Sequence, residues 1–127
     1  MAKKILIVED EEAILTLLSE IFGDLAEYVV LCARDGEEAL RIARVYNPDI
    51  ILMDVQLPKM NGHEVCKSVK SDPAMSHTKI LILSGFAQNS DWQKAQEVGA
   101  AACIAKPFSS IALVEKVEEL LRSNSRG

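Results

Sequence analysis

Five short, mostly apolar runs divide the chain at nearly even intervals. Each run is bounded by acids or by turn-forming residues and is too short for a buried helix, so each is predicted to be a strand. The third run carries four consecutive apolar residues before a terminal carboxylate, which is typical of a strand buried on both faces. The predicted strands are Lys4–Val8, Tyr28–Cys32, Ile50–Asp54, Lys79–Leu83 and Ala101–Ala105.

Between these strands, apolar residues recur at helical spacing. The first helix follows four acids, which suit the positive end of the helix dipole, and its apolar stripe consists of Ile14, Leu17, Leu18, Ile21, Phe22 and Leu25. A second helix is expected from an N-cap at Asp35 to Tyr46, where Asn47-Pro48 ends it. A shorter helix follows Gly62, and a weakly apolar one covers about 90–98. The stripe of the last helix consists of Leu113, Val114, Val117, Leu120 and Leu121. Residues 71–78 are expected to form a loop, and 123–127 a polar tail.

Strict alternation of strands and helices predicts right-handed crossovers and a parallel sheet covered by helices on both sides. The expected fold is α/β, a doubly wound five-stranded parallel sheet in the flavodoxin-like order 2-1-3-4-5, flanked by five helices. The length of 127 residues fits one domain, expected over residues 1–127 with a core of about 4–122.

Composition narrows the class of protein. Hydrophobic residues make up 49% of the chain and the net charge is −5, which disfavours a direct nucleic-acid binder. No apolar run has the length of a signal-peptide core or a membrane span, so a cytoplasmic protein is expected. Cys32, Cys66 and Cys103 lie in apolar surroundings without metal-ligand spacing and are predicted to be buried and reduced, whereas His63 and His77 are predicted to be exposed.

Polar residues gather where the predicted strands end. These residues are Glu9, Asp10, Asp54, Ser84 and Lys106. The carboxyl ends of parallel strands meet at one edge, and in the order 2-1-3-4-5 the first and third strands are neighbours where the winding reverses. Asp10 and Asp54 should therefore face each other. Clustered carboxylates favour Mg²⁺, and with a lysine and a hydroxyl nearby the site is suited to a phosphoryl group.

Taken together, these residues resemble the receiver domain of two-component response regulators, over essentially the whole chain. The resemblance lies in four motifs in the expected order: Glu9-Asp10, Asp54 with Pro58 and Gly62 at four-residue steps, Ser84-Gly85, and Lys106-Pro107-Phe108. It implies that Asp54 accepts a phosphoryl group from a phosphohistidine of a sensor kinase or phosphotransfer protein. It also implies a signalling domain and not an enzyme, apart from its own phosphotransfer and slow dephosphorylation.

The resemblance further assigns roles residue by residue. Asp10, Asp54 and the backbone carbonyl of Gln56 would bind Mg²⁺, and Glu9 would assist through a water. Lys106, before a cis Pro107, and Ser84 would contact phosphoryl oxygens. Phosphorylation would then shift the face made by the fourth helix, the fifth strand and the fifth helix, where Trp92 and Cys103 are the expected contacts for an unknown downstream protein. A monomer or weak homodimer is expected.

One position departs from the family pattern. Three residues before the lysine, receivers usually carry Tyr or Phe, whereas this chain has Cys103, so a smaller conformational change on activation is predicted. Gln56 and Phe86, each two residues after a site residue, are expected to tune the lifetime of the phosphoryl group.

Three other classes of protein remain as alternatives. A haloacid-dehalogenase-type hydrolase needs a second Asp where Gln56 stands, and a flavodoxin-like cofactor binder needs a phosphate loop where four acids follow Val8. A receiver that no longer accepts phosphate and acts only in protein interaction is the third. The sequence does not distinguish a stand-alone regulator from a phosphoryl relay or from a receiver excised from a longer chain.

Overall fold

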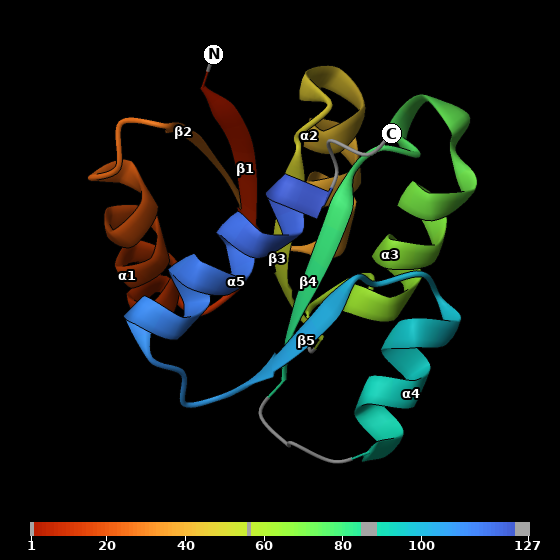
Figure 1. The fold of residues 1–127 in the computed structure, drawn as a ribbon. Helices are drawn as coiled ribbons and strands as arrows, with labels where there is room; N and C mark the ends of the chain where they lie inside the picture. The colour runs from red at the N-terminus through yellow and green to blue at the C-terminus, as the bar shows by residue number, and fades with distance from the viewer. Residues whose placement is uncertain (1, 56, 85–88, 124–127) are drawn as a thin grey trace.

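A single parallel sheet lies at the centre of the molecule (Figure 1). The structure is a computed structural model, and it describes residues 2–55, 57–84 and 89–123. Within these ranges the sheet has five strands in the order β2-β1-β3-β4-β5, so the predicted fold class and strand order are confirmed. The strands are β1 (Lys3–Val8), β2 (Tyr28–Ala33), β3 (Ile50–Asp54), β4 (Lys79–Ser84) and β5 (Ala102–Ala105).

The helices of the described residues agree with the predicted ones to within a few positions. They are α1 (Glu12–Gly23), α2 (Gly36–Tyr46), α3 (Gly62–Ser71), α4 (Asn89–Glu97) and α5 (Ser110–Ser123). The predicted cap of α2 is confirmed, because the side chain of Asp35 accepts a hydrogen bond from the backbone N–H of Glu38 at 2.8 Å. A reciprocal capping box between Asn61 and Glu64 begins α3.

The sequence predicted a loop over residues 71–78, but this segment is not entirely a loop. It contains the short 3-10 helix η1 (Pro73–Met75), which Asp72 caps by accepting a hydrogen bond from the backbone N–H of Ala74 at 2.9 Å. Met75 is fully buried, and the buried hydroxyl of Thr78 donates to the Pro48 carbonyl at 2.9 Å. These contacts join the beginning of β4 to the chain before β3, and a single apolar residue in a polar stretch gives no periodic signal of them.

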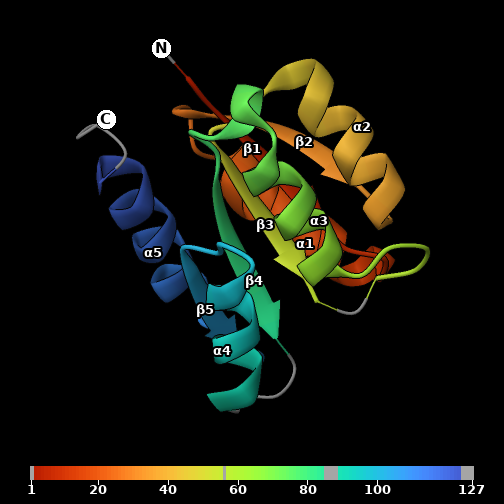
Figure 2. The ribbon, with the colours of Figure 1, turned by 90° about the vertical axis from the view of Figure 1, so that its right-hand side faces the viewer.

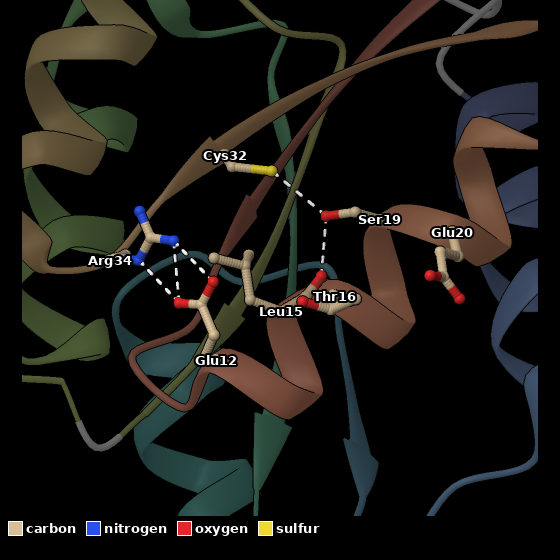
Figure 3. A pocket seen from close by; sticks show the side chains of 7 residues that line it. All are labelled: Glu12, Leu15, Thr16, Ser19, Glu20, Cys32 and Arg34. Atoms are coloured by element: carbon tan, nitrogen blue, oxygen red, sulfur yellow. Dashed lines mark hydrogen bonds and ion pairs between the residues drawn. The ribbon is translucent and has the colours of Figure 1, made fainter.

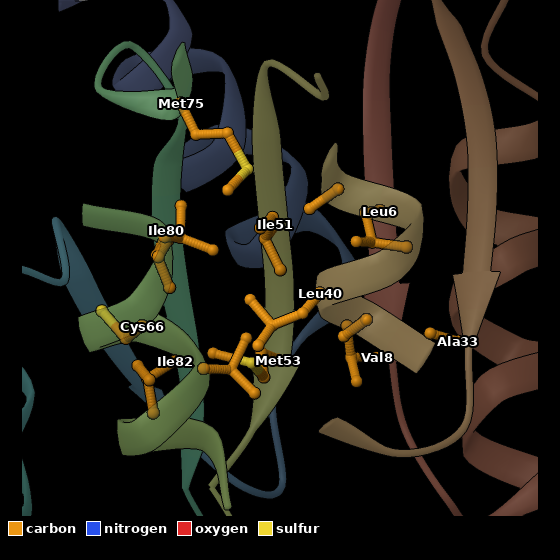
Figure 4. Packing of buried hydrophobic residues seen from close by; sticks show 14 of the residues in the cluster. Leu6, Val8, Ala33, Leu40, Ile51, Met53, Cys66, Met75, Ile80 and Ile82 are labelled. Atoms are coloured by element: carbon orange, nitrogen blue, oxygen red, sulfur yellow. The ribbon is translucent and has the colours of Figure 1, made fainter. Parts of the chain in front are cut away.

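Alternating strand residues build two cores, one on each face of the sheet. Figure 2 shows α5 on one side of the sheet and α2 and α3 on the other. Ile5, Ile7 and Leu52 pack with residues of α1 and α5. Leu6 and Met53, on the opposite face, pack with residues of α2, α3 and α4, and Figure 4 shows part of this second core. Strands β1, β3 and β4 are buried on both faces, which explains their unbroken apolar runs.

Two side-chain predictions were wrong. Cys66 is buried and Cys103 is half-buried, but Cys32 is exposed, because it lies on the edge strand β2. His77 is exposed as predicted, whereas His63 is half-buried and its Nε2 atom has no hydrogen-bond partner among the residues that the structure describes. Within the described part of the chain, none of the three cysteines forms a disulfide. Among the described residues, no helix combines the length and hydrophobicity that crossing a bilayer requires.

Candidate functional site

Strand register brings Glu9 and Asp54 together at the carboxyl edge of the sheet. Val8 pairs with Met53, so the next residue of each strand is at the same level. Both acids continue the alternation of the residues that face α1 and α5. Glu9 is fully buried and Asp54 is only 7% exposed. The sheet therefore holds the carboxyl groups of Glu9 and Asp54 side by side at the edge of its core, whereas the sequence predicted that Asp10 would face Asp54.

Lys106 lies between these two acids. Its Nζ atom is 2.8 Å from Oδ2 of Asp54 and 3.3 Å from Oε2 of Glu9, and its side chain is 18% exposed. The position follows from β5, which ends at Ala105 opposite Ser84, and from a hydrogen bond of 2.7 Å that the Lys106 backbone N–H donates to the Ser84 carbonyl. The Lys106–Pro107 peptide bond is cis, as the resemblance implied.

The surroundings of Glu9 disfavour its ionised form. Burial raises the pKa of the Glu9 carboxyl, and the negative charge of Asp54 raises it further. A hydrogen bond from the backbone N–H of Glu11, at 3.2 Å, and the ammonium of Lys106 act in the opposite direction without cancelling the effect. A cation placed beside Glu9 would relieve this cost.

Lys106 is held in its charged form. Burial alone would lower the pKa of the Lys106 ammonium, but the hydrogen bond to Asp54 and the charges of Asp54 and Glu9 outweigh burial, so the pKa is raised. The ammonium therefore stays protonated well above neutral pH. One positive charge therefore faces the carboxyl groups of two buried acids.

Asp10 completes a group of three acids. Oxygen atoms of Glu9, Asp10 and Asp54 all lie within 4.8 Å of one another, and Asp10 is exposed to solvent while the other two acids are buried. Carboxylate oxygens at this spacing, with room for water on the exposed side, fit the ligand preferences of Mg²⁺. The predicted metal residues with side-chain oxygens therefore come together.

Ser84 lies at the end of β4, one residue beyond the register position of Asp54. Leu83 pairs with Asp54, and Ser84 is buried with 4% exposure. Its place in the alternation puts it with Ile80 and Ile82, on the face opposite to Asp54. Gln56, Gly85 and Phe86, for which the sequence also suggested roles, lie outside the described residues, as does the side chain of Trp92.

Gly62 brings the start of α3 against the site. An added Cβ atom would lie 2.7 Å from the Asp54 carbonyl oxygen and 2.9 Å from the Cα atom of Val55. The backbone N–H of Gly62 donates to the Val55 carbonyl at 2.8 Å. A glycine is therefore required by close backbone approach, which gives a physical reason for the spacing between Asp54 and Gly62.

An apolar hollow beside Lys106 was not predicted from the sequence. Ile14, Leu17, Pro107, Phe108 and the stem of Lys106 surround a cavity of about 360 Å³. Leu17 is 48% exposed, although it belongs to the apolar stripe of α1. Helical periodicity assigned Leu17 to the core, and only the packing of α1 against the loop before α5 shows that it remains partly open.

A second hollow lies away from the acids, between α1 and β2 (Figure 3). Arg34 closes one end through a hydrogen-bonded ion pair with Glu12, with N–O distances of 2.8–3.1 Å. The Ser19 hydroxyl donates to the Leu15 carbonyl at 2.7 Å and lies 3.2 Å from the sulfur of Cys32. Since the serine proton is already used, the thiol donates to Ser19, and this hollow offers no activated nucleophile.

Known proteins with the same fold and similar sequences identify the family. The sequence model of one protein family, the response regulator receiver domain, matches residues 5–118 of this chain. The polar-differentiation response regulator DivK of Brucella ovis is 38% identical over 124 residues, covering 95% of this chain and 98% of DivK. Chemotaxis response regulator CheY4 of Vibrio cholerae superposes with a TM-score of 0.88 and 32% identity, covering 94% of this chain and 99% of CheY4.

A third relative was solved with a metal ion. The receiver domain of the sensor histidine kinase PA1611 from Pseudomonas aeruginosa, with magnesium coordinated in its active-site cleft, superposes with a TM-score of 0.86 and 26% identity, covering 95% of this chain and 98% of that chain. The family match, the sheet order and the acidic cluster beside a lysine agree with one another. The chain belongs to the response regulator receiver domain family, and it is a signalling domain of two-component systems that works through an aspartyl phosphate, not an enzyme of the classical kind.

Proposed function

We propose that Asp54 is the residue that accepts the phosphoryl group, with residues of about 4–122 acting as one receiver unit. The observation that carries this assignment is the position of the Lys106 ammonium, 2.8 Å from the Asp54 carboxylate and 3.3 Å from that of Glu9. Asp54 keeps 7% of its surface exposed and has a cationic neighbour. Glu9 is fully buried and Asp10 has no cationic partner within 4 Å among the described residues, so neither acid is as well suited.

The metal in this proposal is Mg²⁺. Asp10 and Asp54 would bind it directly together with the backbone carbonyl of Gln56, and Glu9 would contribute through a water. The three acid oxygens within 4.8 Å of one another support this assignment, as does the magnesium-bound receiver of PA1611. When bound, Mg²⁺ supplies neutralisation of the negative charge that a phosphoryl group brings next to the acids.

The residues of this chain would share the transfer step. An oxygen of Asp54 forms a bond to phosphorus while the P–N bond of the donor phosphohistidine breaks, and the released imidazole nitrogen takes up a proton from water. The ammonium of Lys106, which pairs with the Asp54 carboxylate before the transfer, would pair with a phosphoryl oxygen after it. The Ser84 hydroxyl donates to a second phosphoryl oxygen. Because Ser84 belongs to the opposite side of the alternation, its side chain has to turn toward Asp54 for this contact.

The donor would be a sensor histidine kinase or a phosphotransfer protein, which membership in the receiver family implies. The donor histidine has to approach Asp54 beside Lys106, where the apolar hollow with Leu17 and Phe108 opens. We expect apolar side chains of the donor to pack there. The downstream partner would bind the face made by α4, β5 and α5, with Cys103 where an aromatic side chain is usual and Trp92 as a candidate contact.

Phosphorylation of the intact protein by a small donor tests the assignment. Incubation with acetyl phosphate and Mg²⁺ should add about 80 Da to the intact mass, the increment of one phosphoryl group. Asp54→Asn should abolish the gain, whereas Asp24→Asn, at the exposed end of α1, should retain it. A wild-type protein that gains no mass, or an Asp54→Asn variant that still does, would refute the assignment and favour a receiver that acts only in protein interaction.

A further inference from the structure

The loop between Asp54 and the start of α3 is held by contacts near both of its ends. Gly62 closes the base of this loop by its hydrogen bond to the Val55 carbonyl. Val55, Leu57 and Met60 pack against the core under α2 and α3. The loop leaves directly from the proposed phosphoacceptor, and the proposed carbonyl ligand at position 56 belongs to it. Whatever fixes this loop therefore also bears on the metal site.

The first residue of α2 contacts the same loop near its tip. An added Cβ atom on Gly36 would overlap the carbonyl oxygen of Met60 and lie 2.6 Å from the Met60 Cβ atom. The backbone N–H of Gly36 also faces the Pro58 carbonyl at 3.5 Å. Since backbone atoms of Met60 fill this space, no side chain fits at position 36 unless the loop moves. Glycine there permits direct backbone contact between α2 and the loop.

Lys59 makes a second attachment from the loop to α2. Its backbone adopts a left-handed conformation with φ of 69°, which is uncommon for a residue other than glycine. Its Nζ atom lies 3.7 Å from Oδ2 of Asp35 and 3.9 Å from Oε1 of Glu37, the residues on either side of Gly36. The loop is thus attached to the start of α2 by a charged side chain and by close backbone packing.

Resting on the proposed function, we propose that Gly36 is a positioning residue for the metal site. Its close contact with Met60, together with the Lys59 ion pairs, holds the loop after Asp54 in the arrangement that binds Mg²⁺. The start of α2 thereby sets the affinity of a site that it does not touch. Residues that orient metal ligands without binding the metal commonly change affinity by about 10-fold or more when replaced.

Titration of the full chain with Mg²⁺ by calorimetry, and with Mn²⁺ by electron paramagnetic resonance, tests this proposal. Gly36→Ala should weaken binding by about tenfold. The matched control is Gly23→Ala, at a site where an added Cβ atom has no neighbour within 4 Å, and it should leave the dissociation constant unchanged. Circular dichroism identifies a temperature at which each variant is folded, so that the constants compare folded proteins. A merely structural role would lower the melting temperature and leave the dissociation constant of the folded protein unchanged.

Lys59→Asn is the second variant, and it decides the matter if Gly36→Ala does not fold. Asn tolerates the left-handed backbone, so the substitution removes mainly the ion pairs. Loss of a nearby positive charge would by itself tighten cation binding. Weakening by about twofold, of the order expected for an exposed ion pair, therefore supports lost positioning. Unchanged or tighter binding in the folded variants would overturn the proposal. A wild-type protein that binds no Mg²⁺ would overturn the proposed function as well, whereas tight binding in both wild type and Gly36→Ala would overturn the positioning role alone.

Discussion

Replacing Lys106 by Met is the most direct probe of the charge balance at this site. Met keeps most of the apolar stem, so the change removes the ammonium and little of the packing. The ammonium lies 2.8 Å from Asp54 and 3.3 Å from Glu9. Without it, a fully buried carboxylate and a nearly buried one are left within 4.8 Å of each other. We expect the metal-free variant to be clearly less stable than the wild type.

The size of the loss follows from these distances. At an effective dielectric near 20, the two attractions are gross terms of about 6 and 5 kcal/mol, and the repulsion between the acids at 4.8 Å is about 3.5 kcal/mol. Desolvation of the ammonium offsets most of the attraction, and removing one partner of a buried pair costs roughly 3–5 kcal/mol. Because Lys106 is 18% exposed and water can enter the vacated space, we expect a net loss of about 2–3 kcal/mol.

Urea unfolding at pH 7.5, followed by circular dichroism with EDTA and then with Mg²⁺, measures this loss. A cation that takes over the role of the ammonium should stabilise Lys106→Met more than the wild type, by an increment that grows with the logarithm of its concentration. Burial and the charge of Asp54 raise the pKa of Glu9, and the ammonium of Lys106 partly opposes this increase. Without the ammonium, the pKa of Glu9 should be raised further. When folding raises the pKa of an acid, the protein becomes less stable as pH rises. Lowering the pH should therefore restore part of the stability that Lys106→Met loses.

Lys116→Met provides the matched control. Lys116 pairs with Glu119 at 3.4 Å on the surface of α5, with both side chains substantially exposed, so its loss should cost about 0–1 kcal/mol. The reasoning is refuted if Lys106→Met is as stable as Lys116→Met without metal, or if Mg²⁺ stabilises the two variants equally.

Three further predictions concern other parts of the chain. Gly62→Ala should lose about 1–3 kcal/mol of unfolding free energy by chemical denaturation, because its Cβ atom would crowd the Asp54 carbonyl, while a loss no larger than that of Gly23→Ala would contradict this. Burial raises the pKa of the Cys66 thiol to about 11, so the fold keeps this thiol protonated, and its contribution to stability is complete below the ordinary thiol pKa of about 8.5 and disappears as pH rises toward 11. The decline with pH should be shallower in Cys66→Ala; equal slopes in the two proteins would count against it. With Cys103 in place of an aromatic side chain, beryllofluoride should shift amide resonances mainly in the loops after β3 and β4. Large shifts throughout residues 100–120 would contradict the predicted smaller conformational change.

Much of the fold was predictable because its signals are local. The unbroken apolar run of β3 reports burial on both faces, and the Asp35 cap lies next to the helix that it begins. The short helix at Met75 and the exposure of Cys32 were not predictable in this way. The first depends on one apolar residue reaching a distant core, and the second depends on β2 being at the edge of the sheet.

The sequence by itself determined the order of strands and helices along the chain, and it placed acids, a serine and a lysine at the strand ends, because periodicity and turn residues act over a few positions. Only the tertiary structure decided that Glu9 is the fully buried acid, that Lys106 lies between Glu9 and Asp54, and that the start of α2 packs directly on the loop after Asp54. These contacts join residues far apart in the chain. Their distances are set by the register and twist of the sheet and by close backbone packing, which no local pattern records.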